Sequence, residues 1–191
     1  MLRIREENVN TQANWDAHYS ATPESEHIWN EPGLPNEFAK RFPMDAHVID
    51  LGAGSSIGLR RISKLRPDLK WSAADQSGAA IAHMSASGFP WVGLDLLDLN
   101  KPLPFADRLF DVVMCTEVIE HLEDPAAAVR EFRRIARKMV AVTCPFENTI
   151  DTDYHVWSIG AKDMIQMFSG VKNLELIRTR GGAILAAFAT L

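Results

Sequence analysis

Residues 47–58 read HVIDLGAGSSIG, and the interpretation of the whole chain works outward from this stretch. Its first part, Val48 to Leu51, combines branched apolar residues with one carboxylate, as is typical of a short buried strand. Small residues follow, and apolar residues then recur at helical spacing from Ile57 to Leu65. A strand, a glycine turn and a helix form the half-unit that binds nucleotide-like ligands in doubly wound α/β folds. The glycines allow the backbone to approach a ligand, and the helix N-terminus offers free N–H groups to it.

The carboxylate and the glycine spacing restrict the kind of ligand. Asp50 lies two residues before Gly52, where a dinucleotide site usually has an apolar residue. The third glycine of a G-x-G-x-x-G pattern is absent, because position 57 is Ile57. A carboxylate at this place repels a pyrophosphate but suits a cationic amino-acid group through ordered hydrogen bonds. These features favour an adenosyl ligand without phosphates, bound by Asp50 and by the loop residues Gly52, Gly54 and Ser55.

The composition is that of an ordinary soluble globular protein. The chain has 191 residues, of which 47% are hydrophobic and 24% are charged, which is enough for one sizeable core. Its net charge of −5 argues against non-specific binding of nucleic acid. No signal peptide is visible in Met1–Asn14, and the longest apolar tract, Ala183–Leu191, is too short to span a bilayer. We therefore expect a cytoplasmic protein without membrane association, with Cys115 and Cys144 as small core residues.

From residue 46 onward, strand and helix patterns alternate regularly. Strands are predicted at 46–51, 69–75, 89–94, 110–115 and 138–144. Helices are predicted at 56–65, 77–86, 124–137 and 158–169. The pattern then changes to two strands, Val171–Arg178 and Ala183–Ala189, joined by a turn that contains Gly181 and Gly182.

These elements predict an α/β fold. We expect a Rossmann-like, doubly wound, seven-stranded and mostly parallel sheet that is closed by an antiparallel C-terminal hairpin. A single domain is expected to span residues 1–191, with the ligand-binding α/β core at 46–191. Residues 1–45 show no strand alternation and are expected to form a lid over the ligand pocket.

Aromatic residues are the notable feature of the N-terminal segment. Trp15, His18 and Tyr19 share helical spacing, which predicts a short amphipathic helix. Trp15 and Trp29 could instead only pack against the core, and this alternative is compatible with a lid. The sequence leaves both interpretations open.

Residues that follow the predicted strands are the candidates for the ligand site, since ligands of such sheets bind beyond the carboxyl ends of the strands. Asp75, followed by Gln76, comes after the second strand, about 20 residues beyond the glycine loop. A carboxylate there is placed to accept hydrogen bonds from both ribose hydroxyls. The alternative role for Asp75 is a helix cap, which Ser77 could fill instead.

A second aspartate is expected at the base of the ligand. After the third strand, Asp98 can accept a hydrogen bond from the exocyclic amine of adenine, while the backbone N–H of Leu99 addresses the ring. Asp95 competes for this role, but Asp98 lies directly before a Leu-Pro-Phe turn and has the better spacing.

The most specific stretch is residues 103–125, which reads LPFADRLFDVVMCTEVIEHLEDP. Together with Asp50-x-Gly52-x-Gly54 and Asp75, it resembles the motifs of class I S-adenosylmethionine-dependent methyltransferases. The resemblance covers roughly residues 46–145 and is to the branch of small enzymes that includes the ubiquinone-pathway O-methyltransferases. It implies S-adenosylmethionine as methyl donor and S-adenosylhomocysteine as product. The chain departs from many members at Ser56, where they carry a third glycine.

Methyl transfer from a sulfonium is an in-line displacement, so the protein contributes positioning and, where the acceptor loses a proton, a base. The candidates are Glu117, Glu120 and His121, whose i, i+3, i+4 spacing would place them on one helical face. Glu120 and His121 could hydrogen-bond the loop and orient the next helix, or His121 or Glu117 could be the general base. Alternatively, the three could bind a divalent metal with His155 as a fourth ligand, because carboxylate and imidazole suit Mg²⁺, Mn²⁺ or Zn²⁺.

The metal alternative also rests on a second resemblance. The small-RNA 3′-end 2′-O-methyltransferases have a similar Glu-x-x-Glu-His pattern with a later ligand. Acceptor substrates of the family bind where this chain has an acidic and aromatic loop, so Tyr154, His155 and Trp157 are expected substrate contacts.

The predicted function is methyl transfer from S-adenosylmethionine to an O or N atom of a small molecule. Two alternatives stay open: a metal-dependent RNA 2′-O-methyltransferase and a catalytically inactive, methyltransferase-like binding module. A nicotinamide-dependent oxidoreductase is disfavoured by Asp50 and by the missing third glycine.

Overall fold

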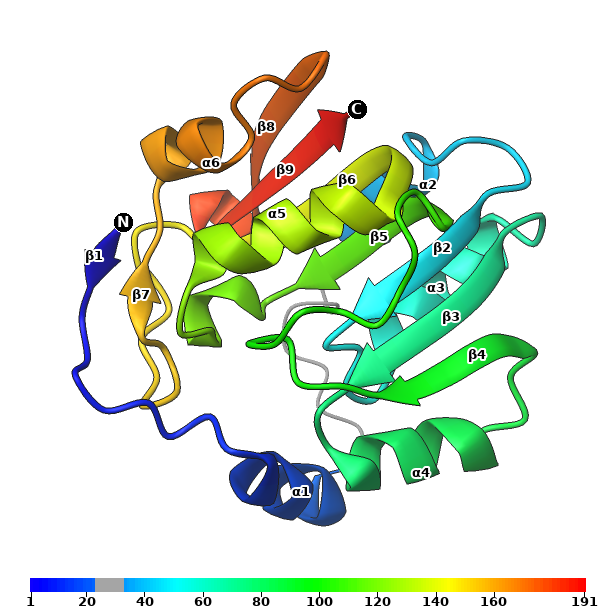
Figure 1. The fold of residues 1–191 in the computed structure, drawn as a ribbon, viewed down its shortest axis with the longest axis horizontal. Coiled ribbons are helices and arrows are strands. Elements are labelled where there is room, and N and C mark those ends of the chain that lie inside the picture. Colours follow the sequence, from blue (N-terminus) through cyan, green and yellow to red (C-terminus); the bar gives the residue numbers. More distant parts are fainter. Residues whose placement is uncertain (23–32) are drawn as a thin grey trace.

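The structure, a computed structural model, describes residues 1–22 and 33–191 (Figure 1). The seven strands of its main sheet are β2 (His47–Leu51), β3 (Lys70–Asp75), β4 (Trp91–Leu96), β5 (Phe110–Thr116), β6 (Ala136–Pro145), β8 (Asn173–Thr179) and β9 (Ile184–Thr190). The α-helices are α1 (Gln12–Ala21), α2 (Gly33–Ala39), α3 (Ile57–Leu65), α4 (Gly78–Ala86), α5 (Pro125–Ile135) and α6 (Ala161–Met167). Short elements are β1 (Leu2–Arg3), β7 (Trp157–Ser158) and the 3₁₀ turns η1 (Ile119–His121) and η2 (Arg180–Gly182).

The strand order of the main sheet is β4-β3-β2-β5-β6-β9-β8. The first five strands are parallel, whereas β9 runs antiparallel to both β6 and β8. The chain builds outward from β2 to β4 and then returns to add β5 on the other side of β2. The order therefore reverses between β2 and β5, which is where open α/β sheets bind ligands. The predicted seven-stranded α/β fold with an antiparallel C-terminal pair is confirmed.

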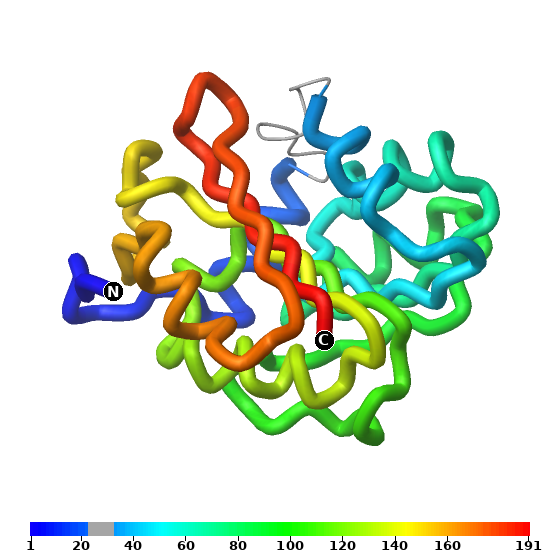
Figure 2. Tube along the Cα trace, turned by 90° about the horizontal axis from the view of Figure 1, so that it is seen from above, coloured from blue at the N-terminus to red at the C-terminus, as the bar shows by residue number. Residues whose placement is uncertain are grey.

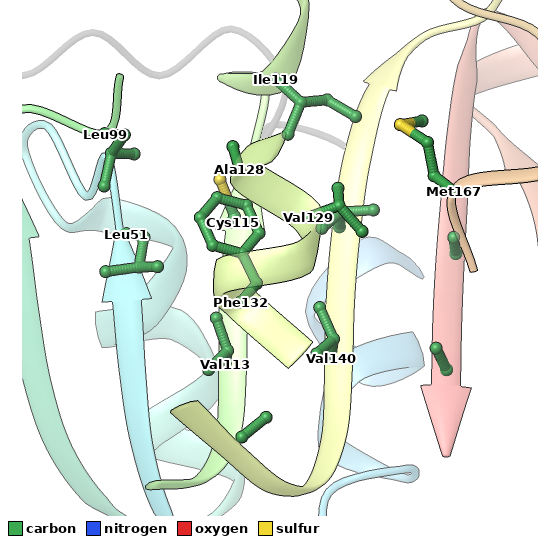
Figure 3. Packing of buried hydrophobic residues seen from close by; sticks show 14 of the residues in the cluster. Leu51, Leu99, Val113, Cys115, Ile119, Ala128, Val129, Phe132, Val140 and Met167 are labelled. Carbon is green, nitrogen blue, oxygen red and sulfur yellow. The ribbon is translucent and has the colours of Figure 1, made fainter. Parts of the chain in front are cut away.

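Helices cover both faces of the sheet, and each face has its own apolar cluster. On one face, α5 and α6 pack against the sheet, with Phe132 and Val129 of α5 in contact with the cluster that contains Val113 and Val140 (Figure 3). On the other face, α2 and α3 cover Trp71 and its neighbours. Cys115 and Cys144 are buried and unpaired, as predicted.

Helix α5 shows how the local sequence sets an element boundary. The Asp124 side chain accepts a hydrogen bond of 2.9 Å from the N–H of Ala127, and Pro125 occupies the first turn. The helix ends at Ile135, two residues before the predicted end, because Ala136 already pairs with Phe110 in the parallel ladder.

The last predicted helix, 158–169, is shorter in the structure and begins at Ala161. Trp157 and Ser158 instead form β7, which pairs antiparallel with Leu2 and Arg3 of β1. Figure 2 shows the N-terminal segment lying beside this part of the chain. Two-residue strands have no alternation to recognise, so neither β1 nor β7 was predicted.

The predicted N-terminal helix exists as α1, and the Thr11 side chain caps it by accepting from the N–H of Asn14. It lies against the start of α4, where one carboxylate oxygen of Asp16 accepts hydrogen bonds from the Ser77 hydroxyl and the Ala79 N–H. No residue of α1 is buried, so polar contacts and the ring contacts of Trp15 hold it, rather than packing in the apolar core. The predicted packing of Trp29 falls outside the described residues. None of the helices formed by residues 1–22 and 33–191 is long and apolar enough to cross a bilayer.

Candidate active site

A cavity of about 650 Å³ opens at the carboxyl ends of β2, β3 and β5. This volume lies within the range of small-molecule sites in proteins. Six segments far apart in the sequence supply its walls: the N-terminal segment, the glycine loop, the ends of β3 and β4, the loop after β5, and the loop after β6. The lining residues include Asn10, Trp15, His18, Tyr19, Gly52, Gly54, Ser55, Asp75, Gln76, Asp98, Leu99, Glu117, Glu120, His121, Tyr154 and His155.

The glycine loop approaches its neighbours so closely that side chains are excluded. Gly52 has a φ of 72°, and a Cβ on it would lie 2.5 Å from a methyl carbon of Val118. Gly54 has a φ of 51°, and a Cβ there would collide with the hydroxyl of Tyr19. Both positions therefore require glycine, and the bare backbone of Gly54 faces the cavity.

Ser56 occupies the position at which many members of the resembled family carry a third glycine. Its φ of 58° lies in the left-handed region, which glycine adopts without steric cost. Serine occupies the same conformation here at a conformational cost, and its hydroxyl, buried, has no hydrogen-bond partner among the described residues. The loop thus keeps the backbone geometry that a third glycine would give, immediately before α3.

Asp75 joins the glycine loop to the next helix. Its two carboxylate oxygens each accept a hydrogen bond of 2.8 Å, one from the N–H of Gly54 and one from the N–H of Ser77. Burial raises the pKa of Asp75, although these hydrogen bonds oppose the shift. Ser77 is the N-cap of α4, because its hydroxyl accepts a hydrogen bond from the N–H of Ala80. Asp75 is therefore not the helix cap, which was the alternative to a ligand-binding role. Gln76 also lines the cavity and donates to the carbonyl of Asn10.

Asp50 lies beneath the glycine loop rather than on the cavity wall. It is 3% exposed, and its Oδ1 has no hydrogen-bond partner among the described residues. Burial, and then the nearby charge of Asp75, raise the pKa of Asp50 to about 8. Gly52, Gly54 and Ser55 therefore line the cavity, as predicted for the ligand site, whereas Asp50 does not.

The two aspartates that competed for the base-binding role lie in different places. Asp98, Leu99 and Asn100 line the cavity, and Asp98 accepts a hydrogen bond of 3.0 Å from the N–H of Asn100. Asp95 lies within β4 and does not line the cavity. The location of Asp98 thus agrees with the spacing argument from the sequence.

Glu117, Glu120 and His121 all line the cavity, but they do not lie on one face of an α-helix as predicted. Only the last two lie in η1, a single 3₁₀ turn, and Glu117 precedes it with a φ of 55°. Because Glu117 has a left-handed backbone conformation, no α-helix can run through it. The turn after β5, and not helical spacing, therefore brings the three side chains to the cavity.

Two imidazoles in the cavity wall are each held by a hydrogen bond at Nδ1. His121 Nδ1 lies 2.9 Å from the carbonyl oxygen of Tyr154, so Nδ1 carries the proton and Nε2 is left unprotonated. His155 Nδ1 lies 2.9 Å from Oδ1 of Asn148, whose amide nitrogen donates to Asp151. Both histidines therefore keep an Nε2 lone pair free. Burial lowers the pKa of His121 to about 4 and also lowers the pKa of His155, so both rings are neutral at pH 7.

Glu120 is the least compensated polar group of the site. It is 1% exposed, and neither carboxylate oxygen has a hydrogen-bond partner among the described residues. Burial, and then the charge of Glu117, raise its pKa. Glu117 accepts a hydrogen bond of 2.8 Å from the Thr143 hydroxyl, and burial raises its pKa to about 7.

These orientations bring three potential metal ligands together. One ligand atom each of Glu120, His121 and His155 lies within 4.8 Å of the others, whereas Glu117 is outside this group. An unprotonated imidazole nitrogen whose partner nitrogen donates to an oxygen is the usual form of a metal-binding histidine. The donor set fits a divalent transition metal such as Zn²⁺ or Mn²⁺.

Two of the three residues predicted to contact the acceptor lie in the cavity wall. Tyr154 and His155 line the cavity, but Trp157 does not. The indole N–H of Trp157 donates to the carbonyl of Leu122 at 2.8 Å, and the Arg3 guanidinium lies over its ring. Its position indicates a structural rather than a substrate-binding role.

The N-terminal contribution was only partly predicted. Trp15, His18 and Tyr19 line the cavity, and their i, i+3, i+4 spacing was the available signal. The Trp15 ring lies 5.5 Å from that of His121 and 5.2 Å from that of Tyr154. Asn10 also lines the cavity and donates to the Tyr154 carbonyl, but no sequence pattern pointed to it.

Comparisons with known proteins agree with this geometry. Residues 49–142 match a family model described as a methyltransferase domain. One similar solved structure is a chain from the complex between the Haloferax volcanii Trm112 methyltransferase activator and a methyltransferase. It has a TM-score of 0.74 and 17% sequence identity, over 92% of this chain and 96% of that one. No curated protein matches the sequence.

Two further solved structures are similar over their full length. A SAM-dependent methyltransferase from Aquifex aeolicus has a TM-score of 0.69 and 15% identity, over 92% of this chain and 97% of that one. A SAM-dependent methyltransferase from Thermotoga maritima, described as a possible histamine N-methyltransferase, has a TM-score of 0.70 and 14% identity, over 94% and 99%.

The doubly wound sheet with its antiparallel closing pair, the glycine loop beside Asp75, and the matched domain define a class I methyltransferase fold with its site. The chain contains a methyltransferase domain at residues 49–142 and has the fold of S-adenosylmethionine-dependent methyltransferases.

The residues present fit this methyl donor. Gly52 and Gly54 leave space in which a Cβ would collide with neighbouring atoms, and the Asp75 carboxylate holds this loop by accepting a hydrogen bond from the N–H of Gly54. The buried carboxyl of Asp50 lies behind the loop with an unpartnered Oδ1, and the ammonium and sulfonium groups of a ligand on the loop would favour its charged form. When bound, S-adenosylmethionine supplies an electrophilic methyl group.

Proposed function

We propose that the chain transfers the methyl group to an oxygen or nitrogen atom of a small molecule. The observation that carries the proposal is the His121 imidazole, whose Nδ1–H is held by the Tyr154 carbonyl while Nε2 stays free in the cavity wall. A hydroxyl or amine acceptor can donate its proton to this nitrogen as it attacks the methyl carbon. An acceptor that has no proton to lose would gain nothing from the arrangement.

The chemistry assigned to the chain is mainly positioning. Backbone atoms of the glycine loop and the carboxylates of Asp75 and Asp98 would hold the donor, with Leu99 against its base. His121 or Glu117 would accept the proton of the acceptor, and Tyr154 and His155 would contact the acceptor itself. We expect α1, as part of the N-terminal lid, to exclude water from the reacting groups.

The size and lining of the cavity support a small acceptor. A volume of about 650 Å³ must hold both donor and acceptor, and aromatic side chains of α1 lie across its acceptor side. The net charge of −5 gives no general attraction for a polynucleotide. An RNA 2′-hydroxyl as acceptor is therefore the less favoured alternative, and a cytoplasmic location stays a prediction.

The first experiment combines binding and turnover. Calorimetric titration with S-adenosylmethionine and S-adenosylhomocysteine, with NAD as control, is expected to show heat for the adenosyl ligands only. Formation of S-adenosylhomocysteine would then be measured with panels of phenols, amines and short RNAs. Turnover with RNA alone would contradict the small-molecule proposal, and binding without turnover on any panel would favour an inactive binding module.

A metal-dependent reaction is the second candidate, favoured by the converging Glu120, His121 and His155. The trio would hold one divalent ion, which would supply Lewis-acid activation of an acceptor oxygen. Titration with Mn²⁺ is expected to give a binding heat that is lost in Glu120→Gln and kept in His83→Gln, a histidine on α4 outside the cavity. No Mn²⁺ or Zn²⁺ heat with the parent protein would leave the metal-free reaction as the only candidate.

A further inference from the structure

Helix α1 spans the two halves of the cavity. At its start, Trp15 packs over His121 and Tyr154 on the acceptor side. One turn later, Tyr19 reaches the glycine loop on the donor side, where its hydroxyl is the nearest atom to the position of a Cβ on Gly54. The two rings also stack on each other, with centroids 5.9 Å apart. A single helix therefore carries contacts to both binding regions.

The Tyr19 hydroxyl donates no hydrogen bond within the part of the chain that the structure describes. Among the described residues the structure gives it no hydrogen-bond partner, although the side chain lines the cavity. Burial, and then the charges of Asp75 and Asp50, raise the pKa of Tyr19, so the phenol is neutral and carries its proton. The surroundings thus supply carboxylates but leave the donor unused.

The Tyr19 side chain lines the cavity without filling it. The cavity keeps a volume of about 650 Å³ with the Tyr19 ring in place, and its lining includes both that ring and the backbone of Gly54. A ligand that lies on the glycine loop must therefore touch the phenol.

We propose that Tyr19 is a cofactor-binding residue contributed by α1, and that its hydroxyl donates a hydrogen bond to an oxygen of the donor on the glycine-loop side. The inference rests on the donor binding assumed in the proposed function. Because α1 has no buried residue and is held only by the Asp16 hydrogen bonds to Ser77 and Ala79 and by ring contacts among the described residues, we expect it to be an element of low local stability. Donor binding adds a contact to α1 and so also stabilises Trp15 over the acceptor side.

The test uses S-adenosylhomocysteine, so no acceptor is needed. Calorimetric titration is expected to show about three- to tenfold weaker binding for Tyr19→Phe, the loss of one neutral hydrogen bond, and a larger loss for Tyr19→Ala. Ser20→Ala removes a hydroxyl from the exposed side of the same helix and is expected to bind like the parent. Thermal unfolding of the unliganded variants checks the fold.

A second readout follows α1 itself. Amide hydrogen exchange over residues 12–21 is expected to slow on addition of S-adenosylhomocysteine in the parent, and to slow less in Tyr19→Phe. Unchanged affinity of Tyr19→Phe would overturn the hydrogen bond, and tighter binding by Tyr19→Ala would show that the ring obstructs the site. Absence of any heat with the parent would instead refute donor binding, and with it the proposed function and the Tyr19 contact.

Discussion

The carboxylate of Asp75 accepts a 2.8 Å hydrogen bond from the N–H of Gly54, which fixes the glycine loop to the end of the neighbouring strand. The second oxygen of the same carboxylate is used by the N–H of Ser77. One side chain thus positions the loop and the start of α4, and the same residue lines the cavity. The ligand site and the local backbone depend on the same group.

Substitution of Asp75 by Asn is therefore expected to weaken binding of S-adenosylhomocysteine by at least about tenfold. An amide can accept only one of the two N–H hydrogen bonds and would turn a donor toward the other. Each hydrogen bond to a charged acceptor is worth about 1.5–3 kcal/mol. Calorimetric titration measures the effect, with Asp95→Asn in β4 as the matched carboxylate-to-amide control. Equal affinity of Asp75→Asn and the parent would rule out the ribose-binding role.

His121→Asn separates orientation from proton transfer. The Asn amide can still donate to the carbonyl of Tyr154, but it has no group in the place of Nε2. We expect S-adenosylhomocysteine binding to persist while turnover with a hydroxyl or amine acceptor falls by about a hundredfold, the usual worth of a positioned base. Turnover at the parent level would exclude His121 as the base.

The Asp50 carboxyl is expected to make the ligand-free protein less stable as the pH rises from about 4 to about 8. The carboxyl of Asp50 has a reference pKa of 3.8, and burial raises the pKa to about 8 in the folded state. Between these values the folded state binds the proton that the unfolded state releases, so the free energy of unfolding decreases with increasing pH. Asp50→Asn removes this contribution and is expected to flatten the profile, measured as denaturation midpoints at pH 5 and pH 9. A parallel downward shift at both pH values would contradict it.

Trp157→Phe tests whether this residue is structural. The substitution removes the hydrogen bond from the indole N–H to the Leu122 carbonyl but keeps an aromatic ring under Arg3. We expect the free energy of unfolding to fall by about 1 kcal/mol, with unchanged binding of S-adenosylhomocysteine and unchanged KM for an acceptor. A raised KM without loss of stability would instead support the substrate contact predicted from the sequence.

The donor half of the site could be predicted because its residues follow strands whose order the pattern reveals. Gly52, Gly54 and Asp98 follow a strand and Asp75 is the last residue of β3, and parallel strands bring those ends to one edge. Asp50 shows the limit of this reasoning. It lies within β2, where side chains alternate between the two faces of the sheet. The motif does not reveal that this alternation keeps the Asp50 side chain out of the cavity wall.

The acceptor half was harder to predict because it depends on backbone conformation and on long-range polar contacts. The left-handed Glu117 cannot be recognised from a spacing that also fits a helix. Likewise, the hydrogen bonds of Asn10 and Arg5 to the loop after β6 leave no periodic trace in the sequence.

The pairing of β1 with β7 has a consequence for the order in which the molecule forms. Arg5 donates to the carbonyl of His155, a residue 150 positions later, directly beside this pairing. Loops of such length are closed only after local contacts have reduced the entropy cost, and chains elongate from their first residues. We therefore expect the parallel sheet to assemble first on the ribosome, and the rim of the cavity to be completed only when the segment around Trp157 has emerged. The cavity would therefore become complete only after the chain around His155 and Trp157 has been synthesised.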